Sequence, residues 1–201
     1  PAQIIYTSGT ESQPKGAILT HEAVMWQYVS CIIDGSMATD DTVLHALPLY
    51  HCAQLDVFLG PAIYLGATSL ITGKPVPDNV LALIAKHKIN SFFAPPTIWI
   101  AMLRSPSFDR TDLSTLRKGY YGASIMPVTV LQRLRQSQPG IGFYNCFGQS
   151  ELGPLCTVSA RDEIMEQVQD AVDKGATVLA GGKKLDKPGA WMEATLLADV
   201  T

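Results

Sequence analysis

The chain has 201 residues, a net charge of −3, 47% hydrophobic residues and 16% charged residues. This is the composition of a soluble globular domain with a sizeable core, and the mild acidity argues against nucleic acid as a partner. No apolar run approaches the roughly 18 residues that a membrane-spanning helix needs. The four cysteines are widely spaced without a Cys-x-x-Cys pair, which indicates reduced thiols and a cytoplasmic location.

Predicted strands and helices alternate along residues 1–158. Short β-branched or aromatic runs predict strands at residues 2–6, 17–19, 42–47, 68–72, 89–94, 116–121 and 141–146, the first of them buried. Apolar patterns predict helices at residues 20–34, 55–65, 78–87, 97–103 and 127–136, with Thr20 and Asp78 as N-caps. The alternation indicates an α/β fold with a mainly parallel sheet and flanking helices. In such sheets ligands bind beyond the carboxyl ends of the strands.

The loop between the first two strands, residues 6–16, combines hydroxyl groups, glycines and one lysine. Backbone N–H groups and hydroxyls in such a turn can converge on an anion, and Lys15 adds a positive charge. The phosphate loop of nucleotide triphosphatases needs Gly-Lys-Ser/Thr before a helix. Here Lys15 lies between Pro14 and Gly16, so the spacing does not fit that class. The remaining alternatives are another kind of phosphate-binding loop and a polar hairpin without a ligand.

The same loop resembles the signature phosphate loop of the adenylate-forming enzymes, the superfamily of acyl- and aryl-CoA ligases, peptide-synthetase adenylation domains and beetle luciferases. Residues 6–10 and 14–16 match its common form, Tyr-Thr-Ser-Gly-Thr-Thr-Gly-x-Pro-Lys-Gly, whereas Glu11 and Ser12 depart from it. A carboxylate at Glu11 about 5 Å from a phosphate charge would add roughly 3 kcal/mol of repulsion at an effective dielectric near 20. We therefore expect Glu11 to point outward or to pair with a cation. The resemblance implies that the phosphates of ATP are held by Thr7, Ser8, Gly9, Thr10 and Lys15, with catalytic roles for Thr10 and Lys15.

Three further segments resemble motifs of this superfamily. In residues 147–151 the resemblance implies that Phe147 stacks on adenine beside Gly148, that Ser150 approaches the α-phosphate, and that Glu151 binds magnesium in a catalytic role. In residues 121–124 it implies that small residues lie against adenine, namely Gly122, Ala123 and Ser124. In residues 47–51 it implies that His51 lines the pocket for the acid. The other histidines, His21, His45 and His87, belong to no motif, and we interpret them as structural or exposed.

The activity that the resemblance implies is ATP-dependent acid activation. A carboxylate, here expected to be a fatty acid, attacks the α-phosphorus of ATP, and the acyl group passes to CoA. Residues of the superfamily beyond the glutamate motif, a ribose-binding Asp, a hinge, an Arg and a mobile lysine, have no counterpart here, so we expect an incomplete enzyme. One alternative is a catalytically dead remnant that at most binds nucleotide. A peptide-synthetase module is disfavoured, because no carrier domain or serine motif is seen.

From residue 159 the sequence changes character. A charged helix is predicted at residues 161–174, with Gly175 at its end and a strand at residues 177–180. Residues 168–182 and 188–201 resemble a fragment of an aldehyde dehydrogenase, although a generic helix–strand unit is an alternative. We therefore expect a partial AMP-binding domain at residues 1–158 fused to a foreign fragment at residues 159–201. Strands such as residues 89–94 would then lack sheet neighbours, which predicts exposed apolar surface and self-association.

Overall fold

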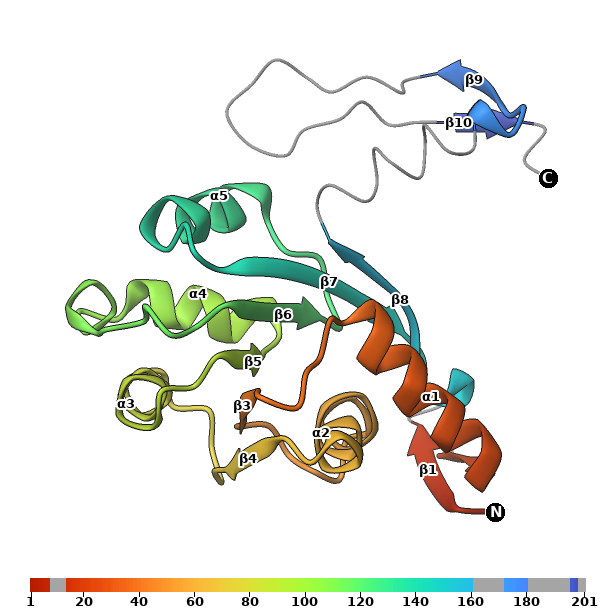
Figure 1. Ribbon diagram of the computed structural model, residues 1–201, viewed down its shortest axis with the longest axis horizontal. Coiled ribbons are helices and arrows are strands. Elements are labelled where there is room, and N and C mark those ends of the chain that lie inside the picture. The colour runs from red at the N-terminus through yellow and green to blue at the C-terminus, as the bar shows by residue number, and fades with distance from the viewer. Residues whose placement is uncertain (8–13, 161–171, 181–195, 199–201) are drawn as a thin grey trace. The chain divides into compact units, whose positions relative to one another are not determined.

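The computed structural model describes residues 1–7, 14–160, 172–180 and 196–198. Six strands form one sheet in the order β4-β3-β5-β6-β7-β8 (Figure 1). Their bounds are Thr42–His45 for β3, Thr68–Ile71 for β4, Ser91–Phe93 for β5, Lys118–Gly122 for β6, Gly142–Gly148 for β7 and Leu155–Ala160 for β8. Strand β3 pairs in parallel with β4 and β5, and the pairs β5–β6 and β6–β7 are also parallel. The predicted mainly parallel α/β fold is confirmed, although β8 was not predicted.

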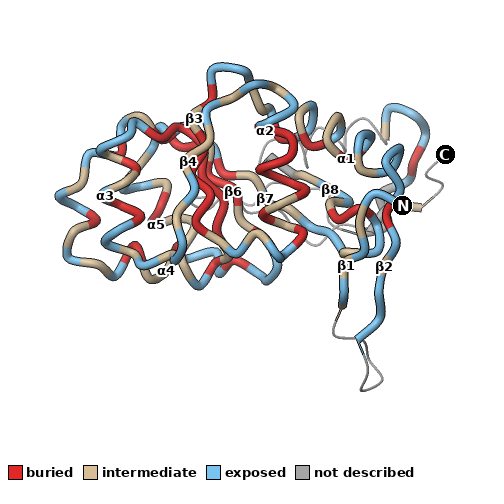
Figure 2. The backbone as a smooth tube through the Cα atoms, turned by 90° about the horizontal axis from the view of Figure 1, so that it is seen from below, coloured by how far each residue is buried: buried red, intermediate tan, exposed pale blue. Residues whose placement is uncertain are grey.

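Helices cover both faces of this sheet, as Figures 1 and 2 show. One face carries α3 (Pro77–His87), α4 (Pro96–Arg104) and α5 (Val128–Ser137), and the other carries α1 (His21–Asp34) and α2 (Gly60–Leu65). Because successive side chains of a strand point to opposite faces, Phe92 and Phe93 of β5 enter two different cores. A 3-10 turn, η2 (Phe108–Arg110), follows α4.

The predicted helices form, with two differences. Thr20 caps α1 as expected, since its side chain accepts a hydrogen bond from the Ala23 N–H at 3.1 Å. Asp78 does not cap α3: the helix begins at Pro77 with Val76 as N-cap, and proline suits a first position because its missing N–H needs no partner there. Residues 55–65 belong to two helices, the π-helix η1 (Ala53–Leu59) and then α2. Sequence periodicity does not distinguish a short π-helix from an α-helix.

The hairpin of β1 (Gln3–Thr7) and β2 (Lys15–Leu19) stands apart from the main sheet. The predicted burial of the first strand is wrong. Ile4 is 54% exposed and Tyr6 is 72% exposed, because among the described residues no further layer covers that face of the two-stranded ribbon. In Figure 2 the paired strands run outward from the body of the fold.

The predicted exposure of the strand in residues 89–94 is also wrong. Ile89, Phe92 and Ala94 are fully buried. Strand β5 lies between β3 and β6 in the middle of the sheet, with helices on both faces, so it has the neighbours that it was expected to lack.

The chain divides into two compact units, Pro1–Val158 and Ser159–Thr201. In the second unit β9 (Thr177–Ala180), a predicted strand, pairs antiparallel with β10 (Leu196–Ala198), which was not predicted. Gly175 has a φ of 104°, and its N–H donates to the Val172 carbonyl at 2.9 Å, as suits a helix end. Most of the predicted helix at residues 161–174 lies outside the described residues. None of the described helices is long and apolar enough to cross a bilayer.

Candidate functional site

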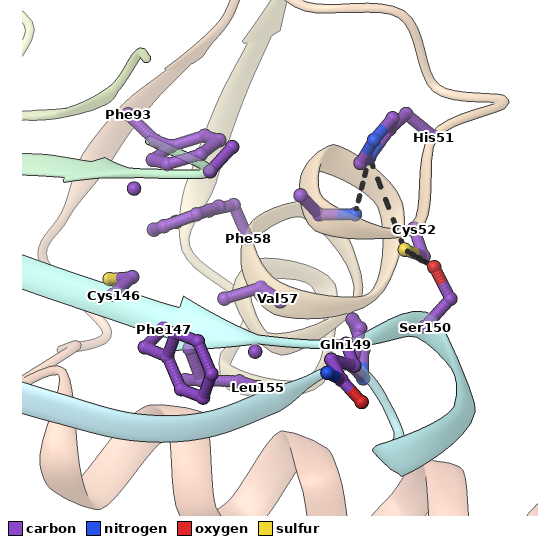
Figure 3. A pocket seen from close by; sticks show the side chains of 15 residues that line it. His51, Cys52, Val57, Phe58, Phe93, Cys146, Phe147, Gln149, Ser150 and Leu155 are labelled. Carbon is purple, nitrogen blue, oxygen red and sulfur yellow. Dashed lines mark hydrogen bonds between the residues drawn. The ribbon is translucent and has the colours of Figure 1, made fainter. Parts of the chain in front are cut away.

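A cavity of about 280 Å³ lies beyond the carboxyl ends of β6 and β7 (Figure 3). Six of the residues singled out in the sequence line it: His51, Gly122, Ala123, Phe147, Gly148 and Ser150. These residues come from three separate segments, and the parallel sheet brings the ends of its strands to one edge. The predicted loop after the seventh strand begins later than expected, because Phe147 and Gly148 are the last residues of β7 itself.

One half of the cavity is apolar and comes largely from residues without a motif. Val57, Phe58, Phe93, Cys146 and Leu155 line it. The rings of Phe58 and Phe93 are stacked, with centroids 4.4 Å apart and an interplanar angle of 16°, and both side chains are buried. Burial raises the pKa of the Cys146 thiol to about 12, so this sulfur is a protonated, apolar part of the wall at neutral pH. An apolar wall with a flat aromatic base suits the apolar body of a small molecule.

The other half is polar, and Figure 3 shows its groups converging. The Cys52 sulfur lies 3.1 Å from Ser150 Oγ and 4.0 Å from His51 Nδ1. His51 Nδ1 also accepts a hydrogen bond from the Ala53 N–H at 3.2 Å. Cys52, the N-cap residue of η1, is thereby connected to the 3-10 turn η3 (Ser150–Leu152), which follows β7. These contacts place a hydroxyl group and an imidazole on the same side of the cavity.

The turn after β6 is shaped for close approach. A Cβ atom at Gly122 would lie 2.3 Å from the Cys146 carbonyl oxygen, so only glycine allows β6 and β7 to meet there. Ala123 has a φ of 64°, in the left-handed region that non-glycine residues seldom adopt. Strain of this kind gathers at binding sites, where the surrounding structure holds it in place. Phe147, which also lines the cavity, is 59% exposed, so its ring is free to accept a flat ligand.

Ser124 and Glu151 do not line this cavity, and both are exposed. Glu151 nevertheless follows Ser150 directly in η3. Magnesium is commonly held by one or two carboxylates together with the phosphates of a nucleotide, so a single exposed carboxylate fits an ion that arrives with its substrate. Among the residues that the structure describes, no group of three His, Cys, Asp or Glu side chains could hold a resident metal.

The predicted phosphate loop is described only at its two ends. Ser8, Gly9 and Thr10 lie outside the described residues, as does Glu11. Thr7 is half-buried and pairs with the exposed Lys15 at the outer end of the hairpin. Both hairpin strands contact η3, the turn that contains Ser150 and Glu151. The hairpin and the cavity are therefore attached to the same short segment.

A buried hydrogen-bond network lies next to the cavity wall. His45 is fully buried at the end of β3, and its Nδ1 accepts a hydrogen bond from Gln54 Nε2 at 2.8 Å. Its Nε2 then carries the proton and faces Ser69 Oγ at 3.2 Å. Gln54 Oε1 accepts from the Leu47 N–H at 3.3 Å, so this side chain connects β3 to η1. The interpretation of His45 as structural is confirmed, whereas His21 and His87 are exposed.

Burial of His45 predicts a pH-dependent stability. It lowers the pKa of the imidazole from 6.5 to about 4, so between these values the unfolded chain binds a proton that the folded chain does not. The free energy of unfolding therefore rises with pH from 4 to 6.5 and then levels off, and His45 contributes a loss of about 2 kcal/mol between pH 7 and pH 5. Burial raises the pKa of Asp56, which acts in the opposite direction. Urea unfolding of the wild type and of His45→Asn at both pH values isolates the histidine contribution as the difference between them. An equal pH dependence in both proteins would contradict it.

A mainly parallel sheet with a cavity beyond its strand ends is the architecture of α/β ligand-binding domains. The family model described as AMP-binding enzyme matches residues 1–182, and the chain belongs to this family. The match runs past residue 158, so the likeness of the later residues to aldehyde dehydrogenases is not shown.

Two relatives illustrate the family, and one solved structure illustrates the fold. Feruloyl-CoA synthase of Amycolatopsis sp is 30% identical over 168 residues, which are 84% of this chain and 34% of that protein. Long-chain-fatty-acid–CoA ligase of Bacillus subtilis is 30% identical over 160 residues, 77% of this chain and 28% of that protein. The inhibitor-bound N-terminal domain of FACL13 from Mycobacterium tuberculosis has a similar fold, with a TM-score of 0.75 and 24% identity over 82% of this chain and 40% of that one. The chain thus spans about a third of the length of these curated relatives.

Proposed function

We propose that this chain carries the ATP- and acid-binding part of an acid–CoA ligase that forms an acyl-adenylate. The observation that carries the proposal is the cavity, which gathers Gly122, Ala123, Phe147, Ser150 and His51 from separate segments. Its polar half suits a nucleotide α-phosphate and a carboxylate, and its apolar half suits the body of the acid. The family match supports ATP and CoA as substrates.

The proposed chemistry requires little acid–base catalysis. A carboxylic acid is already ionised at neutral pH, so its oxygen can attack the α-phosphorus of ATP directly while pyrophosphate leaves. The thiol of CoA then attacks the acyl carbon, and AMP leaves. In this scheme Ser150 and the loop hydroxyls orient the α-phosphate, Lys15 neutralises phosphate charge, and His51 helps to admit the acid. Magnesium, held by Glu151, would neutralise further phosphate charge.

We propose a fatty acid as the substrate, because residues 55–65 and the cavity wall are apolar. The relatives are named for both aryl and fatty acids, so a panel of both decides the substrate. A cavity near 280 Å³ is just below the usual range of about 300 to 1,000 Å³ for small-molecule sites, which favours acids of modest size. The four free cysteines agree with a cytoplasmic location, which we also propose.

ATP–pyrophosphate exchange tests the activity. We expect label from pyrophosphate to enter ATP only when a suitable acid is present, with the fatty and aromatic acids compared at equal concentrations. ATP binding without exchange for any acid would leave the alternative, a nucleotide-binding remnant. Failure to bind ATP at millimolar concentration would overturn both.

Replacement of Phe147 tests the adenine site. Stacking of a base on an aromatic ring is worth about 1 to 3 kcal/mol, so Phe147→Ala should raise the KM for ATP about 5- to 150-fold. Phe147→Tyr keeps the ring and should remain within about twofold of the wild type. The KM for the acid measures whether the change is confined to the nucleotide. Equal changes in the KM for ATP in the two variants would show that Phe147 does not stack on adenine.

We further propose that residues 159–201 derive from an aldehyde dehydrogenase and were joined to the AMP-binding portion near residue 158. The division of the structure into Pro1–Val158 and Ser159–Thr201 supports this origin, whereas the family match through residue 182 speaks against it. Sequencing of the genomic reading frame across residues 150–165 tests the junction.

Self-association is a separate proposal, which rests on exposed apolar side chains in the first unit. Trp26 and Ile33 of α1 are 66% and 69% exposed, and Ile4 and Ile18 of the hairpin are 54% and 65% exposed. Sedimentation velocity measures the oligomeric state.

A further inference from the structure

A buried carboxylate connects the hairpin to the cavity wall. Gln3 Nε2 of β1 donates a hydrogen bond of 2.8 Å to Asp56 Oδ1 of η1. Asp56 is 1% exposed, and its second oxygen, Oδ2, has no hydrogen-bond partner. Within the part of the chain that the structure describes, no other buried side-chain oxygen or nitrogen lacks a partner.

The two residues belong to the two halves of the proposed site. Gln3 begins the strand that leads into the phosphate loop, and Thr7 ends that strand. Asp56 lies on the π-helix whose first residue, Ala53, lines the cavity beside His51 and Cys52. The hydrogen bond thus joins the hairpin to the wall of the cavity, 53 positions further along the chain.

Stability alone does not account for a carboxylate at this place. Burial of an ionisable side chain with only one hydrogen bond is unfavourable, and an apolar residue of similar size would serve packing better. Burial accordingly raises the pKa of Asp56, while the bond from Gln3 acts in the opposite direction. Residues that break a packing rule in this way concentrate at functional sites.

We propose that Asp56 is a positioning residue that, through Gln3, holds the phosphate-loop hairpin at a fixed distance from the cavity. It contacts neither ATP nor the acid. Its effect is to keep Thr7 and Lys15, the paired residues at the outer end of the hairpin, in place relative to a nucleotide in the cavity. The proposal rests on the proposed function for its kinetic consequence, but the attachment of the hairpin is independent of any activity.

The kinetic test uses four variants of the full chain. Gln3→Ala removes the donor, and Gln3→Glu places two carboxylates together, so both should raise the KM for ATP by about tenfold or more. The KM for the acid and kcat should stay within about twofold. The double variant Gln3→Glu, Asp56→Asn exchanges donor and acceptor and should restore the KM for ATP. Gln136→Ala, at an exposed position of α5, is the matched control and should resemble the wild type.

Trypsin provides a readout that needs no activity. Lys15 is exposed on β2, and release of the hairpin should speed cleavage after it about fivefold or more in both single variants, with the double variant back at the wild-type rate. Unchanged cleavage in both single variants would overturn the proposal, whatever the kinetics. If the wild type shows no exchange activity, the proposed function fails, and faster cleavage that the double variant reverses still supports the attachment.

Discussion

Lys118→Met is expected to lower the free energy of unfolding by about 3 to 5 kcal/mol, because it leaves a buried carboxylate without its cation. Lys118 Nζ lies 2.7 and 2.9 Å from the two oxygens of Asp41 and 2.6 Å from the Ser36 carbonyl oxygen. Asp41 is 2% exposed and, besides the lysine, accepts a hydrogen bond from the Ala38 N–H at 2.9 Å. The ion pair therefore connects the turn before β3 to the start of β6. Both lie at the amino ends of the strands, and the cavity lies at the carboxyl ends.

The neighbouring ion pair is a matched control. Arg117 lies 3.7 Å from Asp40, with both side chains more than half exposed. Arg117→Met should therefore change stability by at most about 1 kcal/mol. The double variant Asp41→Asn, Lys118→Met leaves no unpaired charge and should recover part of the loss. Urea unfolding measures all three, and equal losses for Lys118→Met and Arg117→Met would contradict the buried character of the first pair.

Gly148→Ala is expected to cost about 3 kcal/mol and to abolish nucleotide binding. A Cβ atom at this position would lie 1.9 Å from the Pro154 carbonyl oxygen and 2.9 Å from the Leu155 Cα atom. Backbone atoms cannot rotate away as the end of a side chain can, so the two segments must separate. The expected loss of stability is therefore at the upper end of the usual range for overpacking. Pro154 and Leu155 line the cavity beside the motif of Phe147, so this separation would also deform the proposed adenine site.

Gly140 provides the comparison for this prediction. No heavy atom lies within 4 Å of the position that its Cβ would take, and Gly140→Ala should change stability by less than about 0.5 kcal/mol. Urea unfolding and ATP titration of the two alanine variants test the prediction together. Normal ATP binding by Gly148→Ala would show that the contact with Pro154 does not shape the site.

The sequence predicted the elements better than their surroundings. Hydrophobic periodicity located the strands of residues 89–94 and 116–121, but the exposure expected for the first was wrong, because its neighbours in the sheet, β3 and β6, are far away in sequence. Conversely, the strand at residues 2–6 has a β-branched pattern typical of burial and yet lies in a hairpin separate from the main sheet. Periodicity reports which side chains share a face, and it does not report what covers that face.

The prediction of the candidate site from the sequence was limited in the same way. Motifs identified Phe147, Gly122 and His51, each within a short run of residues. The contact of Cys52 with Ser150, 98 positions apart, and the apolar wall of Phe58 and Phe93 depend on the packing of η1 against the sheet. No local pattern carries such information, and the bond of Asp56 to Gln3 likewise emerges only from the structure.

The most direct test of the central claim is a crystal structure of the protein with a non-hydrolysable acyl-adenylate analogue. The account predicts the adenine between Phe147 and the turn of Gly122 and Ala123, with the acyl group toward Phe58 and Phe93. The phosphate mimic should lie near Ser150 and the hairpin. An analogue bound elsewhere on residues 1–158, or a cavity that stays empty at saturating analogue, would contradict the proposed site.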